Sequence, residues 1–118
     1  MNINTSIENS HYKVLIVEDS ITQAMRLQYT LESAGFIVTH SENGANALEI
    51  LPALKPHLMI SDVVMPGMDG YGLCREVRNI PEMNYMPIIL LTSLSDPDYV
   101  IHGLECGANG WGLAVMMK

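Results

Sequence analysis

Short apolar runs recur along the chain at spacings that leave room for one helix between each pair. Four of these runs are continuous, rich in Val, Ile or Leu, and three or four residues long; they cover residues 14–17, 36–38, 58–60 and 88–91. Runs of this kind are too short for a typical helix and are typical of strands covered on both faces. We therefore expect four parallel strands.

The segments between these runs carry apolar residues at helical spacing. Ser20, with Gln23 three residues later, is a capping box, and Gly35 and Pro56 are stop signals. The expected helical stripes are Ala24, Leu27, Leu31 and Ala34; Ala45, Leu48, Leu51 and Leu54; Tyr71, Cys74, Val77 and Arg78; and Val100 and Leu104 after Asp96-Pro97. Strands that alternate with helices predict an α/β fold with right-handed crossovers and helices on both faces of an open sheet.

The composition is that of one globular domain. The 118 residues are 48% hydrophobic and 16% charged, and we expect a polar leader over residues 1–12 before a single domain over residues 13–118. Six basic and 13 acidic residues give a net charge of -7, so no nucleic-acid partner is expected. With no signal-like start and no membrane-length apolar run, a cytoplasmic location is expected. Cys74 and Cys106 are expected to be buried thiols.

Polar residues end three of the four apolar runs, where a parallel sheet of this kind binds its ligands. They are Glu18 and Asp19 after the first run, Asp62 after the third, and Thr92 and Ser93 after the fourth. Carboxylate oxygens gathered at one sheet edge suit Mg²⁺. Any one of these carboxylates is more often an ordinary strand-end or capping residue. Their convergence, which crowds like charges unless a cation neutralises them, favours a metal site.

Four motifs carry a family resemblance. They are VLIVEDS, ISDVVMPGMDGYGLC, PIILLTS and GLECGANGW, which occur in this order between residues 13 and 111. Together they closely resemble the receiver domain of two-component response regulators, the CheY-like family. The resemblance implies a flavodoxin-like, doubly wound parallel sheet of five strands in the order 2-1-3-4-5.

The resemblance also implies chemistry for the acidic residues. Asp62 would be the phosphoacceptor, taking a phosphoryl group from a histidine kinase or phosphotransfer protein. Glu18, Asp19 and Asp62 would hold Mg²⁺ together with the backbone carbonyl of Val64. The loop at residues 65–70 would let the chain leave the site, and its glycines tolerate strained dihedral angles.

Three further residues receive roles by the same resemblance. Thr92 would contact the phosphoryl group and act in switching, and Ser93 would control the access of water. Trp111 matches the aromatic switch position, and ordinary core packing is an equally good interpretation of this residue.

The end of the chain departs from the family pattern. Receivers normally carry Lys and Pro where this chain has Ala114 and Val115, and Lys118 lies too far along to substitute for the Lys. Gly110 and Gly112 predict an atypical last strand, and no fifth helix is expected within these residues. The domain is expected to be truncated or aberrant after about residue 111, and a shifted reading frame would account for it. Copies are then expected to associate through the incomplete C-terminal face.

Three functions are compatible with these residues. The first is a phosphoacceptor signalling domain that switches an output or kinase domain of a parent protein, and is not a metabolic enzyme. The second is a receiver-like interaction module that no longer switches, because Ala114 replaces the usual Lys. The third, a Mg²⁺-dependent phosphohydrolase, is disfavoured because Val64 stands where such enzymes need an acid-base Asp.

Overall fold

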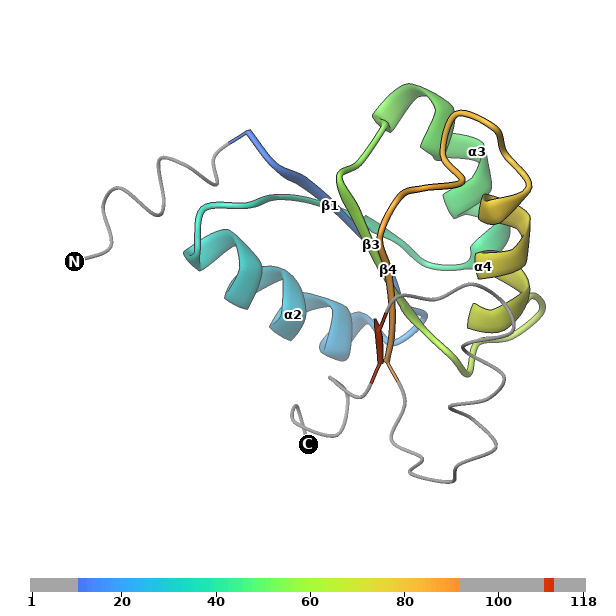
Figure 1. Ribbon diagram of the computed structural model, residues 1–118. Coiled ribbons are helices and arrows are strands. Elements are labelled where there is room, and N and C mark those ends of the chain that lie inside the picture. Colours follow the sequence, from blue (N-terminus) through green and yellow to red (C-terminus); the bar gives the residue numbers. More distant parts are fainter. Residues whose placement is uncertain (1–10, 92–109, 112–118) are drawn as a thin grey trace.

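The computed structural model describes residues 11–91 and 110–111, which form a parallel sheet with helices on both faces (Figure 1). The four apolar runs are strands, as predicted. In chain order the elements are β1 (Lys13–Val17), α2 (Ile21–Ser33), β2 (Ile37–Ser41), α3 (Gly44–Leu54), β3 (Leu58–Asp62), α4 (Gly70–Arg78), β4 (Ile88–Leu91) and β5 (Gly110–Trp111).

The sheet has the strand order β2-β1-β3-β4-β5, and every neighbouring pair is parallel. This confirms the predicted order. At the centre, Val17 of β1 pairs with Ser41 of β2 on one side and with Ser61 of β3 on the other. Helix α2 covers one face of the sheet, and α3 and α4 cover the other (Figure 1). The chain is therefore doubly wound, and the carboxyl ends of β1 and β3 lie side by side.

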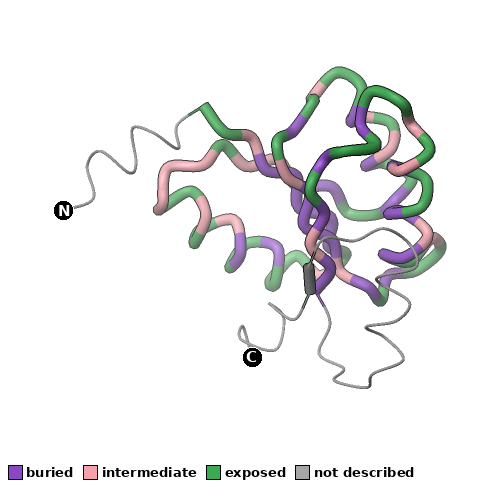
Figure 2. Tube along the Cα trace, viewed as in Figure 1, coloured by how far each residue is buried: buried purple, intermediate pink, exposed green. Residues whose placement is uncertain are grey.

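Each face of the sheet has its own apolar core, and β1 contributes to both. Leu15 and Val17 pack with α3 and α4, whereas Val14 and Ile16 pack on the α2 side with Leu27. Figure 2 shows this buried centre in purple, running along the middle strands. Because successive side chains of a strand point to opposite faces, a continuous apolar run was the correct signal for a strand buried on both faces.

Strand β2 is less buried than its apolar run predicted. Ile37 is 47% exposed, and only Ser41 of the five residues is buried. The reason is topological, because β2 is an edge strand with β1 as its single neighbour. An apolar run alone does not distinguish an edge strand from a central one.

Helix α3 follows most of its predicted stripe, because Leu48, Leu51 and Leu54 pack in the core, but the stripe fails at its first residue. Ala45 is exposed, and the buried residues are Gly44, Ala47 and Leu51. In a helix of 3.6 residues per turn, side chains three residues apart differ in direction by about 60°. A row of residues chosen only at every third position therefore turns gradually away from the buried face. The end of the helix was predicted well: Leu54 is the last residue, before Lys55, whose φ of 48° is left-handed.

Cys74 is fully buried, as expected. Cys106, the helix expected after Asp96, and the departures at Ala114 and beyond lie outside the described residues. None of the helices in the described part of the chain has the length and hydropathy needed to cross a membrane.

Candidate functional site

Three carboxylates meet at the carboxyl edge of the sheet. Glu18 and Asp19 follow β1, and Asp62 ends the neighbouring strand β3. One carboxylate oxygen from each residue lies within 4.8 Å of the others. The convergence predicted from the sequence is therefore present.

Glu18 is held tightly although it is acidic. Its side chain is only 3% exposed, and its backbone N–H donates to the carbonyl of Ser41, 3.0 Å away. Its Oε2 accepts the backbone N–H of Ser20 at 3.1 Å, and the Ser20 hydroxyl in turn accepts the N–H of Gln23. In a capping box the residue at the position of Gln23 would bond the N–H of Ser20. Here Glu18 makes that bond, which ties the carboxylate to the start of α2.

Burial and mutual repulsion disfavour the ionised forms of this cluster. Burial, with added repulsion from Asp62, raises the pKa of Glu18 to about 7. Burial also raises the pKa of Asp62, and repulsion from Asp19 adds to that effect, whereas the backbone N–H groups of Val63 and Val64 oppose it. A bound divalent cation would relieve this repulsion, and three carboxylates supply the hard oxygen ligands that Mg²⁺ prefers. The residues present therefore fit a magnesium ion.

The raised pKa of Glu18 predicts how stability depends on pH without metal. A carboxyl whose pKa is higher in the folded than in the unfolded chain binds protons preferentially in the folded state, so its destabilising effect grows as pH rises from about 4.5 to about 7. We expect the metal-free protein to be less stable at pH 8 than at pH 5, by up to about 3 kcal/mol from this group. Urea unfolding at both pH values measures the difference.

Glu18→Gln provides the control, because the amide oxygen can still accept from Ser20 but no longer titrates. We expect the variant to lose most of the pH dependence, and 10 mM Mg²⁺ to restore the stability of the native chain at pH 8. A Glu18→Gln profile parallel to that of the native chain would contradict the assignment.

The loop between β3 and α4 carries the chain sharply away from Asp62. Gly67 has a left-handed φ of 77°, as the glycine-rich sequence predicted, and the N–H of Gly70 donates to the carbonyl of Val63 at 2.8 Å. Asp69 is the N-cap of α4, and its carboxylate accepts the N–H of Gly72 at 2.8 Å. Asp69 therefore has a structural role.

A hollow of about 360 Å³ borders the cluster. It is lined by Asp19, by residues 42–45 at the start of α3, and by residues 66–68 of the loop after β3. A larger hollow of about 620 Å³ lies among residues of the two loops that lead into β3 and β4, including Lys55, His57 and Tyr85. Of these two hollows, only the smaller one includes a carboxylate of the cluster.

The remaining predicted site residues are described only in part. Val64 follows Asp62 directly, and its side chain is 66% exposed. Trp111 lies in β5 with its backbone paired to Leu90. Thr92 and Ser93 lie outside the described residues. One residue that the sequence reasoning missed is His40, whose ring contacts the backbone of Glu18; a polar residue next to the end of an apolar strand was the available signal.

Comparison with known sequences identifies relatives with one shared domain. The family model of the response regulator receiver domain matches residues 14–111. The probable transcriptional regulator ycf27 of Cyanophora paradoxa is 38% identical over 105 residues, which are 89% of this chain and 43% of that protein. Transcriptional regulatory protein CseB of Streptomyces avermitilis is 38% identical over 104 residues, 88% of this chain and 42% of that protein. The chain thus spans less than half the length of these relatives.

Solved structures agree with the sequence matches. The signal receiver domain of a signal transduction histidine kinase from Syntrophus aciditrophicus superposes with a TM-score of 0.79 at 48% identity, over 86% of this chain and 76% of that one. Vibrio cholerae chemotaxis protein CheY4 gives a TM-score of 0.83 at 35% identity, over 86% of this chain and 84% of that one. Fold, motifs and relatives agree, and the chain belongs to the response regulator receiver domain family.

Proposed function

We propose that this chain is a phosphoacceptor that receives a phosphoryl group on Asp62, with Mg²⁺, from a histidine kinase or phosphotransfer protein in the cytoplasm. Receiver domains are signalling domains rather than classical enzymes, and the chain would act here as a signalling domain. The observation that carries it is the meeting of Glu18, Asp19 and Asp62 within 4.8 Å at adjoining strand ends.

Asp62 is the best nucleophile of the three carboxylates. Glu18 is almost fully buried and already accepts a hydrogen bond from Ser20, while Asp19 is exposed on the loop after β1. Asp62 is half-buried at the end of a central strand, and the backbone N–H groups of Val63 and Val64 partly offset the burial that raises the pKa of its carboxyl. A fixed, partly desolvated carboxylate is positioned for attack on phosphorus.

The step transfers a phosphoryl group from a nitrogen of the donor to an oxygen of Asp62. A carboxylate oxygen of Asp62 attacks the phosphorus, the bond from phosphorus to the donor's imidazole nitrogen breaks, and that nitrogen keeps the electron pair. An acyl phosphate forms on Asp62. When bound, Mg²⁺ supplies charge neutralisation to the phosphoryl oxygens. Glu18 and Asp19 would hold it, with Asp62 and the carbonyl of Val64.

By resemblance to the family, we assign phosphoryl contact and switching to Thr92, control of water access to Ser93, and the aromatic switch position to Trp111. A phosphohydrolase is disfavoured because the exposed Val64 has no group that could transfer a proton. The second candidate function is an interaction module that does not switch, which rests on Ala114 in place of the usual Lys.

Intact-mass measurement separates these functions. The native chain is incubated with Mg²⁺ and acetyl phosphate, and we expect one phosphoryl adduct that decays slowly. An unchanged mass in the presence of bound Mg²⁺ would favour the interaction module. Sustained release of inorganic phosphate over many turnovers would favour the phosphohydrolase.

Metal binding is a separate prediction. We expect Mg²⁺ to bind weakly to the native chain and more weakly to Asp62→Asn, because that variant removes one negative ligand. Trp111, the single Trp of the chain, provides the fluorescence signal. Identical titrations of the two chains would count against a site that includes Asp62.

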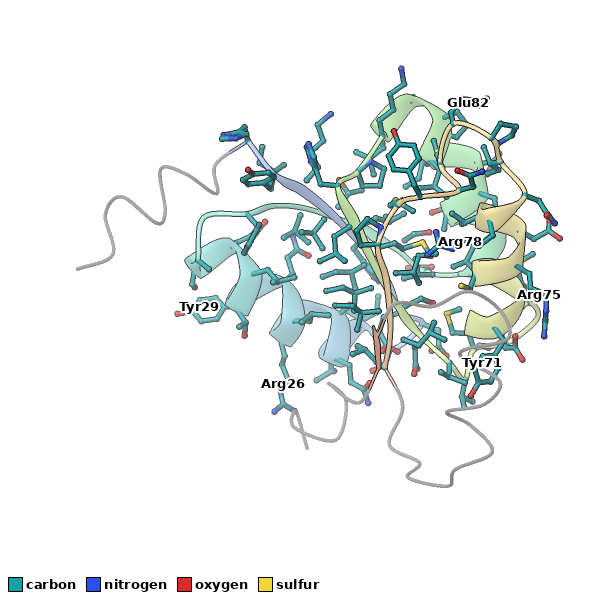
Figure 3. The ribbon with its side chains drawn as sticks, viewed as in Figure 1. Arg26, Tyr29, Tyr71, Arg75, Arg78 and Glu82 are labelled. Atoms are coloured by element: carbon teal, nitrogen blue, oxygen red, sulfur yellow. The ribbon has the colours of Figure 1, made fainter. Side chains whose placement is uncertain are left out.

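An apolar stripe on α2 supports a protein phosphodonor. Ile21, Met25 and Tyr29 recur every four residues and are 51%, 63% and 75% exposed. Figure 3 shows Tyr29 pointing away from the sheet. The stripe begins two residues after Asp19, so a helical partner that packs on it would lie close to the carboxylates. Exposed apolar residues grouped in this way indicate an interaction surface.

A charged residue in this stripe should separate docking from chemistry. We expect Met25→Asp to slow phosphoryl transfer from a phosphorylated histidine protein at least tenfold, because burying the new carboxylate in an apolar interface is costly. The rate with acetyl phosphate should not change, since this donor needs no docking surface. Glu49→Gln, on the exposed face of α3, is the control. An equal loss with both donors would place the defect in the site itself.

A further inference from the structure

His40 of β2 makes a hydrogen bond to the backbone at the carboxyl edge of the sheet, where the chain leaves β1. Its Nε2 lies 2.8 Å from the backbone carbonyl oxygen of Glu18. A carbonyl oxygen only accepts hydrogen bonds, so Nε2 carries the proton and donates it. The ring is half-buried, next to the acidic cluster.

The place of this bond in the sheet explains why a side chain supplies it. The ladder between β1 and β2 runs to the pair Val17 and Ser41, and the N–H of Glu18 donates to the carbonyl of Ser41 at 3.0 Å. In a parallel ladder the next donor to the Glu18 carbonyl would come from Asn43, two residues beyond Ser41. Asn43 instead serves as the N-cap of α3, with its side chain accepting the N–H of Asn46. The imidazole of His40 takes the place of that missing ladder donor.

The bond fixes more than Glu18. The carbonyl of Glu18 belongs to the peptide plane that joins Glu18 to Asp19, so holding this oxygen restrains the backbone that carries both carboxylates. Glu18 is then hydrogen-bonded at three atoms: its N–H to Ser41, its carbonyl to His40, and its Oε2 to Ser20. These three hydrogen bonds define the orientation of the backbone where the chain leaves β1.

We propose that His40 is a positioning residue of the acidic site, which orients the peptide between Glu18 and Asp19 so that both carboxylates face Asp62. This inference rests on the proposed function, because it concerns the metal ligands named there. Groups that bond to the backbone of a ligand loop reduce the reorganisation needed when a cation binds. His40 touches neither the phosphoryl group nor the cation.

His57, in the loop just before β3, provides a matched comparison. Its Nδ1 accepts the backbone N–H of Lys13 at 3.0 Å, at the opposite end of β1 from Glu18. Both histidines therefore hydrogen-bond to a backbone group at one end of the central strand. Only His40 does so at the acidic site. A general role in fastening the sheet would be common to both residues, whereas a positioning role belongs to His40 alone.

The test compares Mg²⁺ affinity in four chains at 10 °C: native, His40→Met, His40→Gln and His57→Met. Met and Gln have similar length, but only Gln can donate from the position of Nε2. We expect His40→Met to weaken Mg²⁺ binding about tenfold, and His40→Gln to bind nearly as the native chain does. We expect His57→Met to lower the melting temperature without changing the affinity.

The outcomes distinguish the inference from the function on which it rests. Native affinity in His40→Met, or an equal loss in His57→Met, would overturn the positioning role while leaving the metal site intact. A His40→Met chain that is unfolded at 10 °C beside a folded His40→Gln would assign the bond to folding and also overturn it. Absence of Mg²⁺ binding by the native chain would defeat the proposed metal site and this inference together.

Discussion

Asp62→Asn should accept no phosphoryl group, from acetyl phosphate or from a phosphorylated histidine protein. The substitution replaces the attacking carboxylate oxygen by an amide of the same shape, which is a much weaker nucleophile and carries no charge for the cation. We expect adduct formation to fall below detection by intact mass, a loss of more than a hundredfold. The fold should be retained, because removing the buried charge of Asp62 also removes its repulsion with Asp19.

Asp69→Asn is the matched control, since Asp69 lies seven residues further along in the same loop region. Its carboxylate caps α4 by accepting from Gly72, and an Asn side chain can accept the same bond. We expect this variant to be phosphorylated as the native chain is. Peptide mapping of the native adduct should locate it on Asp62. An adduct on Asp69, or one that persists in Asp62→Asn, would contradict the assignment.

The position of the site could be predicted from the sequence because it depends on strand ends. The apolar runs locate the strands, and the residues after them must share an edge once the strands are parallel and adjacent. Glu18 and Asp62 follow from this argument alone. Their proximity needed no information on side-chain packing, since Val17 and Ser61 pair directly in the sheet.

Three features of the structure could not be predicted from the sequence, because they depend on where elements end and how they pack: the hydrogen bond of His40, the raised pKa of Glu18 and the exposure of Ala45. The bond from His40 exists because β2 ends and α3 begins before the ladder can supply a donor to Glu18. The polar side chain of His40 marks a candidate residue, but it does not indicate which backbone group the ring contacts. The raised pKa of Glu18 depends on burial by neighbours from several elements. The exposed Ala45 shows that a short stripe defines the buried face of α3 only loosely.

Gly70→Ala should cause the largest loss of stability of any single methyl group added near the site. A Cβ at Gly70 would lie well inside van der Waals contact of the Asp62 carbonyl oxygen and 2.9 Å from the Cα of Val63. Both neighbours are backbone atoms that cannot rotate away, and both are tied to β4: Asp62 pairs with Leu91, and the N–H of Val63 donates to the Leu91 carbonyl at 3.0 Å. Either the sheet edge or the start of α4 must move.

We expect Gly70→Ala to lower the free energy of unfolding by about 3 kcal/mol, and the melting temperature by about 10 °C or more. Because the displaced backbone carries Asp62, the folded variant should also bind Mg²⁺ and accept phosphate less well than the native chain. Thermal melts and intact-mass measurements, both made well below the melting temperature of the variant, separate the two losses.

Gly72→Ala shows whether the effect comes from the close approach or from the helix. Gly72 lies two residues further along α4, and a Cβ there would meet side-chain atoms, Met68 Cγ at 3.2 Å and Asp69 Oδ1 at 3.4 Å. A flexible Met can move by a few tenths of an ångström, and Ala is favoured over Gly in a helix by about 1 kcal/mol. Gly72→Ala should therefore melt at or above the native temperature. An equal fall in the melting temperature of both variants would mean that α4 tolerates no added methyl group at either position. The loss in Gly70→Ala could then not be attributed to the close contact between Gly70 and Asp62.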